Sequence, residues 1–206
     1  GNGYIDLKDL DTYKGITCYV NSTNRCSCAC TFCLRNTKEM LESNSLWLKR
    51  EPTVEMIIAE FEKYDLTAFK EVVFCGFGEP LTRHDDLMKV AKYIKEKRSD
   101  LSIRINTNGL SSITLGRDIA PDFKGVIDTV SISLNAPTKE EYYELTRACY
   151  GVDSFNYMLQ FTKACKKYVP SVVLTVVDII GVEKIKLCQK IADGLGVELR
   201  VRPFEE

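Results

Sequence analysis

Histidine, tryptophan and long apolar runs are scarce in this chain of 206 residues. His84 is the only histidine, and no second C-x2-C or histidine pair is present to complete a typical structural zinc site. The net charge of −1, from 28 basic and 29 acidic residues, gives no electrostatic indication of nucleic acid or an anionic membrane as a partner. The longest apolar stretches, such as Val172–Val177, have the length of a strand and are too short to span a membrane.

The cysteine content argues against a secreted, disulfide-bonded protein. The nine cysteines are an odd number, and no signal peptide is recognisable. Reduced thiols are typical of the cytosol, so we expect a cytoplasmic protein, and low oxygen suits exposed thiolates that oxidise readily. Residues 1–3 are interpreted as a cloning remnant, and residues 4–206 are expected to form one domain.

Four cysteines are concentrated in one short segment, residues 24–35, NRCSCACTFCLR. Cys26, Cys30 and Cys33 have the spacing C-x3-C-x2-C, and Cys28 lies inside the first gap. Thiolates suit iron–sulfur clusters and zinc, and a [4Fe–4S] cluster normally takes four cysteines. The motif therefore provides three ligands and leaves one iron open to another molecule. Cys28 is interpreted as a small side chain of the loop rather than a ligand.

Strand-like and helix-like patterns alternate along the chain. Strands are predicted at Ile16–Val20, Glu71–Cys75, Leu101–Thr107, Thr129–Leu134, Ser171–Val177 and Glu198–Val201. Helices are predicted from Thr53 to about Tyr64, from near Asp85, over Thr114–Ile119, from Thr138 to about Lys167 with a break at Gly151, and over Val182–Leu195. This alternation predicts an α/β fold, a partial (β/α)6 TIM-type barrel with parallel strands. A doubly wound sheet is the alternative.

Each unusual motif follows one of the predicted strands. The cysteines follow the first strand, Gly76–Pro80 follows the second, Thr107–Gly109 the third, and Ser133–Asn135 the fourth. Active-site residues of parallel α/β folds collect at the carboxyl ends of the strands. We therefore expect these motifs to lie close together and to form the functional site.

The cysteine motif, with Phe32 before its last cysteine, resembles the signature of the radical S-adenosylmethionine (SAM) superfamily. The resemblance covers most of the chain and implies a [4Fe–4S] cluster on Cys26, Cys30 and Cys33, with SAM on the open iron. It also implies an enzyme that cleaves SAM reductively to a 5′-deoxyadenosyl radical, which abstracts hydrogen from a substrate. No general base is needed for the first step, and the sequence indicates none. Among subfamilies, the chain looks most like the small radical SAM proteins associated with TatD-type hydrolases.

The segment Gly76–Pro80 resembles the "GGE" motif of this superfamily. Gly76 and Gly78 would let the backbone approach a ligand closely. Glu79 would accept from the ammonium group of SAM or would brace the loop. Asn108, in the turn after the third strand, is a candidate contact for the SAM carboxylate or for the substrate.

Three further parts of the chain resemble the adenosine site of the superfamily. Ser133 and Asn135 point to one face of the fourth strand and resemble a pair that binds the ribose hydroxyls. Phe32 is expected at the adenine through its carbonyl and its ring. The segment starting at Val177, after the fifth strand, matches the adenine-packing motif loosely.

Alternation also predicts which polar residues face the interior of the barrel. Arg104 and Asn106 are expected there, together with polar residues of the last strand, among them Arg200 and Arg202. We predict that Arg104, Arg200 or Arg202 binds a carboxylate or phosphate of the substrate through its bidentate guanidinium. The alternative is an edge strand whose arginines lie in solvent.

The expected partners are SAM, a small-molecule substrate and an electron donor such as flavodoxin or ferredoxin, with a functional link to a TatD-type hydrolase. A glycyl-radical-enzyme activase and an enzyme similar to 7-carboxy-7-deazaguanine synthase are the neighbouring alternatives. A non-catalytic metal-binding module and a purely structural α/β protein are the alternatives of a different class.

Overall fold

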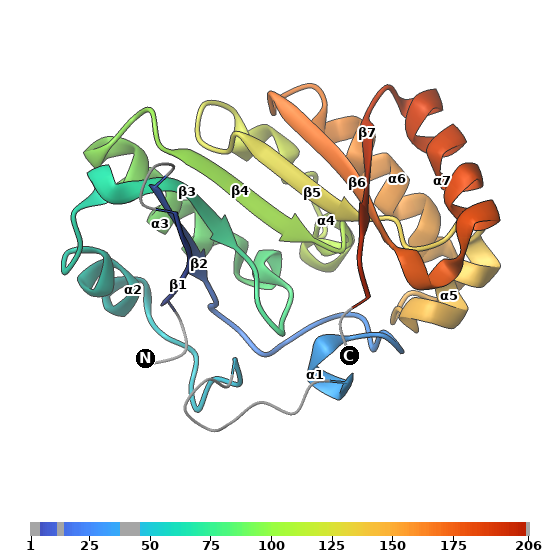
Figure 1. The fold of residues 1–206 in the computed structure, drawn as a ribbon, viewed down its shortest axis with the longest axis horizontal. Helices are drawn as coiled ribbons and strands as arrows, with labels where there is room; N and C mark the ends of the chain where they lie inside the picture. Colours follow the sequence, from blue (N-terminus) through green and yellow to red (C-terminus); the bar gives the residue numbers. More distant parts are fainter. Residues whose placement is uncertain (1–4, 12–14, 38–45, 205–206) are drawn as a thin grey trace.

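A seven-stranded sheet forms the centre of the computed structural model, which describes residues 5–11, 15–37 and 46–204 (Figure 1). The strands follow one another in the sheet in chain order. They are β1 (Ile5–Asp11), β2 (Gly15–Val20), β3 (Phe69–Phe74), β4 (Ser102–Thr107), β5 (Thr129–Ser133), β6 (Ser171–Val177) and β7 (Glu198–Arg202). The cloning remnant predicted at residues 1–3 lies outside the described residues.

Strands β2 to β7 are parallel and confirm the predicted partial-barrel fold. Their order never reverses, as successive crossovers of one hand require. A doubly wound sheet would reverse its order at a switch point, so that alternative is wrong. The sequence did not predict β1, which pairs antiparallel with β2 at the edge of the sheet.

Helices occupy the connections between the parallel strands. They are α1 (Leu34–Thr37), α2 (Val54–Phe61), α3 (His84–Lys97), α4 (Ser111–Leu115), α5 (Lys139–Thr146), α6 (Ser154–Cys165) and α7 (Val182–Leu195). Short 3-10 turns are η2 (Leu66–Ala68), η3 (Pro80–Arg83), η4 (Ala120–Phe123), η5 (Gly151–Asp153) and η6 (Asp178–Ile180). In the described part of the chain, every helix falls short of the length and apolar character that a membrane span requires.

The helix predicted over Thr114–Ile119 is wrong in its position. Helix α4 begins at Ser111 and ends at Leu115, because Gly116 adopts a left-handed φ of 70° that closes the helix. The predicted break at Gly151 is confirmed, since α5 ends before it and α6 begins after η5.

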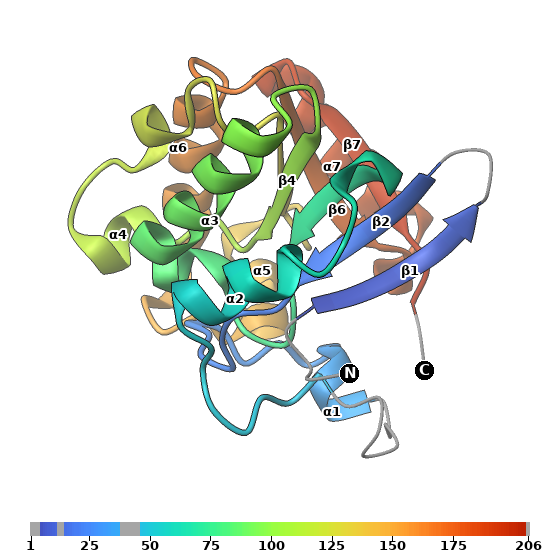
Figure 2. The same ribbon diagram turned by 90° about the vertical axis from the view of Figure 1, so that its left-hand side faces the viewer.

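The two faces of the sheet differ in polarity. On one face the side chains are fully buried, as at Val72, Ile103 and Val130. Figure 2 shows α3, α4 and α6 on one side of the sheet. The register places a second set of side chains on the opposite face, which is polar. Its members include Tyr19, Glu71, Arg104, Asn106, Ser131, Ser133, Thr175, Arg200 and Arg202. The predicted common face of the arginines and of the polar residues of β4 and β5 is therefore confirmed.

Candidate active site

The cysteine loop crosses the carboxyl ends of the strands. Residues 21–33 leave β2 and run along the lower side of the molecule in Figure 1. Two backbone hydrogen bonds fix this loop to the end of α5. The N–H of Ala29 donates to the carbonyl of Thr146, and the N–H of Thr31 donates to the carbonyl of Leu145, both at 2.9 Å. The end of α5 therefore anchors the middle of the cysteine loop.

The thiols of the loop differ in exposure and in acidity. Cys26 is exposed, Cys30 and Cys33 are half-buried, and Cys28 is buried. A hydrogen bond from the Cys28 thiol lowers the pKa of Cys26 to about 6 and also lowers the pKa of Cys30. Burial raises the pKa of Cys33, and the hydrogen bonds to Cys26 and Cys30 raise that of Cys28. Cys28 therefore lies between two ligand candidates as a hydrogen-bond donor, a role that its spacing in the sequence did not indicate.

This donor set fits an iron–sulfur cluster. Thiolates are the ligands of such clusters, and three cysteines of one short loop offer them. Within residues 5–11, 15–37 and 46–204, no group of three or more His, Cys, Asp or Glu side chains is arranged around a single metal ion. The thiolates of a [4Fe–4S] cluster bind different iron atoms, so its ligands do not converge on one point.

The side chain of Asn108 reaches the cysteine loop from the end of β4. Its Nδ2 donates to Ser27 Oγ at 3.1 Å and lies 3.6 Å from Cys28 Sγ and 3.8 Å from Cys26 Sγ. The sequence predicted that this turn would lie near the cysteines, and the structure brings them together. Direct contact of Asn108 with sulfur was not predicted, because it depends on how the loop folds back over the sheet.

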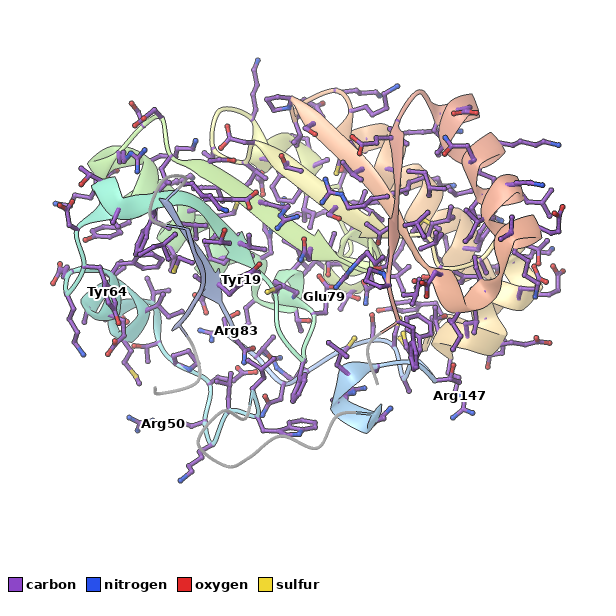
Figure 3. All side chains as sticks on the ribbon, in the orientation of Figure 1. Tyr19, Arg50, Tyr64, Glu79, Arg83 and Arg147 are labelled. Carbon is purple, nitrogen blue, oxygen red and sulfur yellow. The ribbon has the colours of Figure 1, made fainter. Side chains whose placement is uncertain are left out.

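Glu79 is a buried brace between two of the motifs. Its Oε1 accepts from Leu81 N at 3.1 Å and from Thr107 Oγ1 at 2.7 Å, and its Oε2 accepts from Asn108 N at 2.7 Å. The residue is 4% exposed, and burial raises its pKa to about 7. Figure 3 labels Glu79 beside the loop that follows β3. These contacts support the bracing role, one of the two roles considered for Glu79.

The two glycines of this loop allow it to lie directly against the segment that carries the cysteines. A Cβ on Gly76, whose φ is +148°, would lie 2.1 Å from Asn21 Oδ1. A Cβ on Gly78 would lie 2.2 Å from the carbonyl oxygen of Thr23. The N–H of Glu79 donates to the carbonyl of Arg25 at 2.7 Å. A side chain at either glycine would therefore collide with the segment that carries the cysteines, with Asn21 at Gly76 and with the backbone at Gly78.

A cavity of about 370 Å³ opens beside the cysteine loop. It lies between this loop, the end of β5, helix α5 and the turn η6 after β6. Its lining includes Phe32, Ala136, Leu145, Ile179, Ile180 and Lys184. Val177 is half-buried and immediately precedes η6. The structure thus brings Phe32 and the segment after Val177 together around one cavity, as the adenine prediction requires.

The predicted ribose pair lies at the end of β5. Ser133 is half-buried on the polar face of the sheet, and Asn135 is 6% exposed. Asn135 has a φ of 66°, which is uncommon for a residue other than glycine, and its N–H donates to the carbonyl of Thr175 at 3.2 Å. Ser133 is the last residue of β5, and Asn135 lies two residues further on. Because Asn135 has a left-handed backbone conformation, the strand alternation from which a common direction of the two side chains was predicted does not extend to it.

The three arginines of the polar face have different surroundings. Arg104 lies 3.4 Å from Glu71, measured from Nε to Oε1, and its side chain is 18% exposed. Arg200 and Arg202 are exposed and form no ion pair with another described residue. In the register, Arg200 lies beside Thr175 and Arg202 beside Val177. Arg200 and Arg202 lie on β7, the last strand of the sheet. Their position therefore also fits the alternative prediction, an edge strand whose arginines lie in solvent.

Comparison with known proteins identifies the family. The sequence model of the Radical SAM superfamily matches residues 20–187. A Thermococcus kodakarensis protein named "Probable GTP 3′,8-cyclase" is 30% identical over 155 residues, which are 75% of this chain and 45% of that protein. A Methanocaldococcus jannaschii protein named "Putative glycyl-radical enzyme activating enzyme MJ1227" is 29% identical over 167 residues, 81% of this chain and 62% of that protein. The chain therefore spans less than two thirds of the length of these relatives.

Solved structures share the fold. The structure of methylornithine synthase (PylB) has a TM-score of 0.67 at 17% identity and covers 92% of this chain, with 53% of that chain matched. The structure of Streptococcus suis SuiB bound to precursor peptide SuiA has a TM-score of 0.66 at 15% identity, covering 91% of this chain and 39% of that one. The chain belongs to the radical SAM superfamily, whose members are enzymes that use a [4Fe–4S] cluster and SAM.

Proposed function

We propose that Cys26, Cys30 and Cys33 hold the [4Fe–4S] cluster of this enzyme and that SAM binds at its open iron. The observation that carries the proposal is the meeting of three motifs at one edge of the sheet. Asn108 reaches the cysteine loop, and Glu79 fixes the backbone of Asn108. When bound and reduced by the electron donor, the cluster would supply the single electron that cleaves SAM to methionine and a 5′-deoxyadenosyl radical, which would abstract hydrogen from the substrate.

The chain's own residues position SAM in this proposal. Phe32 and the segment after Val177 line the cavity beside the cysteine loop, which we assign to the adenine. Ser133 and Asn135, at the adjoining strand end, are assigned to the ribose hydroxyls. Gly76 and Gly78 hold the loop after β3 against the cysteine segment, so that backbone carbonyls near Glu79 are available to the SAM ammonium.

The substrate is proposed to be an anionic small molecule on the polar face of the sheet. Arg200 and Arg202 are exposed there and are not neutralised by a described carboxylate, which suits them to a carboxylate or phosphate. Arg104 is the weaker candidate, because its charge is already paired with Glu71.

Three narrower functions are candidates within the same chemistry. The M. jannaschii relative, by its name, favours activation of a glycyl-radical enzyme. The relatives named as GTP 3′,8-cyclases favour a nucleotide-like anion, as the exposed arginines also do. An activity similar to 7-carboxy-7-deazaguanine synthase rests on the resemblance of the sequence alone. The same is true of the subgroup associated with TatD-type hydrolases, of the link to such a hydrolase, and of flavodoxin or ferredoxin as electron donor. The proposed cytoplasmic location rests on the odd number of cysteines and their reduced state.

Formation of 5′-deoxyadenosine from SAM tests the proposal. The protein is reconstituted anaerobically with iron and sulfide and is then mixed with SAM and dithionite. We expect 5′-deoxyadenosine from the wild type and none from Cys30→Ala. Metal binding without 5′-deoxyadenosine would instead favour a non-catalytic binding module, and an unchanged Cys30→Ala protein would contradict the assigned ligands.

A further inference from the structure

The hydroxyl group of Tyr142 is buried without a partner. Tyr142 lies on α5 and is 0% exposed. Its hydroxyl has no hydrogen-bond partner within the described part of the chain. Buried polar groups of proteins are hydrogen-bonded in the great majority of cases. The hydroxyl therefore indicates a partner outside residues 5–11, 15–37 and 46–204.

Helix α5, which carries Tyr142, is bonded to the cysteine loop at its last turn. The carbonyls of Leu145 and Thr146, in its last turn, accept from Thr31 N and Ala29 N of the loop. Thr146 lies one turn after Tyr142 on the same buried face of the helix and donates from Oγ1 to the carbonyl of Tyr142 at 2.8 Å. The phenol thus stands one helical turn from the point where the loop is attached.

The surroundings of the phenol keep its proton on the oxygen. Burial raises the pKa of Tyr142 above its ordinary value, so the phenol is neutral. The ring packs edge-on against Phe155, with 5.6 Å between the ring centres. Tyr142 is therefore a neutral donor that is held in place by packing, on the helix whose last turn is bonded to the cysteine loop.

Resting on the proposed function, we infer that the Tyr142 hydroxyl donates a hydrogen bond to a sulfur of the cluster held by the 26–33 loop. Hydrogen bonds to the sulfurs of an iron–sulfur cluster are among the features that set its reduction potential. The reduced cluster carries one more negative charge than the oxidised one, so its sulfurs accept the bond more strongly. Tyr142 is a positioning and tuning residue that makes reduction of the cluster easier.

An anaerobic redox titration followed by electron paramagnetic resonance (EPR) tests this inference. Tyr142→Phe removes only the hydroxyl, and Tyr143→Phe removes the same atom from the next residue, which is 41% exposed. We expect the reduced-to-oxidised ratio at a fixed potential to fall about tenfold in Tyr142→Phe, as for the loss of one hydrogen bond to a charged acceptor. For a one-electron couple this is a shift of about 59 mV to more negative potential. Tyr143→Phe should titrate as the wild type does.

The outcomes separate the inference from the proposed function. An unchanged midpoint potential in Tyr142→Phe overturns the inference and leaves the proposed function intact. A wild-type protein that assembles no cluster contradicts both. Unfolding of the cluster-free proteins checks the fold: Tyr142→Phe should be at least as stable as the wild type, because it loses an unpaired buried hydroxyl and keeps its ring against Phe155. A marked loss of stability would show that the hydroxyl has a protein partner, and the inference would fail.

Discussion

Replacement of Gly78 by alanine tests the tight contact between the loop after β3 and the cysteine segment. The new Cβ would lie 2.2 Å from the carbonyl oxygen of Thr23 and 2.8 Å from that of Arg25. Real Cβ atoms essentially never lie within 3.0 Å of such an atom, so the two backbones must separate by at least about 0.8 Å. Because both neighbours are backbone atoms, no side chain can rotate away to make room.

The expected cost follows from two effects. Separation of the backbones weakens the 2.7 Å hydrogen bond from Glu79 N to Arg25 O, which contributes about 1 kcal/mol. Overpacking adds about 1–3 kcal/mol. We therefore expect Gly78→Ala to lower the free energy of unfolding by about 2–4 kcal/mol in urea titrations and to reduce the iron bound after reconstitution.

A second glycine provides the matched control. Gly194 lies in α7 and is exposed, and a Cβ added there would have no neighbouring atom within 4 Å. Gly194→Ala should raise the free energy of unfolding by about 0.5 kcal/mol, because alanine favours a helix over glycine. If Gly78→Ala were as stable as Gly194→Ala, the close approach of the two loops would be refuted.

Three further predictions concern charge and sulfur. The pKa of Glu79 is about 7 in the folded protein and 4.5 ordinarily, so folding favours the protonated carboxyl. The stabilisation by the protonated carboxyl is complete below about pH 4.5 and is lost as the pH rises to about 7. The free energy of unfolding should fall by about 3 kcal/mol over this pH range, at ~1.36 kcal/mol per pKa unit. Urea titrations at several pH values should show a weaker pH dependence of the free energy of unfolding for Glu79→Gln than for the wild type. The same pH dependence in both proteins would contradict this prediction. Cys30→Ala should abolish iron binding while Cys165→Ala, buried in the core, keeps it, and equal iron contents would count against the assigned ligands. Arg202→Ala should weaken binding of inorganic pyrophosphate about tenfold in calorimetry, as for the loss of one charge-assisted contact. An unchanged affinity would show that Arg202 does not contact the anion.

The parallel strands were predictable because their sequences are short, apolar and bounded by turns. All six lie within two residues of their predicted ends. The edge strand β1 was missed, although Ile5, Asp6 and Leu7 alternate in the required way. Helix α4 was misplaced because its start has no side-chain cap, whereas Thr138, which does cap α5, was recognised.

The location of the site was predictable, but its internal contacts were not. The carboxyl ends of parallel strands meet at one edge, so motifs after four strands had to converge. The contact of Asn108 with the cysteine loop and the three donors to Glu79 depend on the path of loops across that edge. The burial of the Tyr142 hydroxyl without a described partner depends on the packing of α5, and the position of Tyr142 in a helix of mixed polarity gave no signal of it.

The EPR spectrum of the reduced cluster, recorded with and without SAM, tests the central claim most directly. If three thiolates leave one iron open for SAM, addition of SAM changes the g values of the reduced, anaerobically reconstituted protein. A spectrum that stays the same with saturating SAM, or a protein that remains colourless and without signal after reconstitution, would contradict the account.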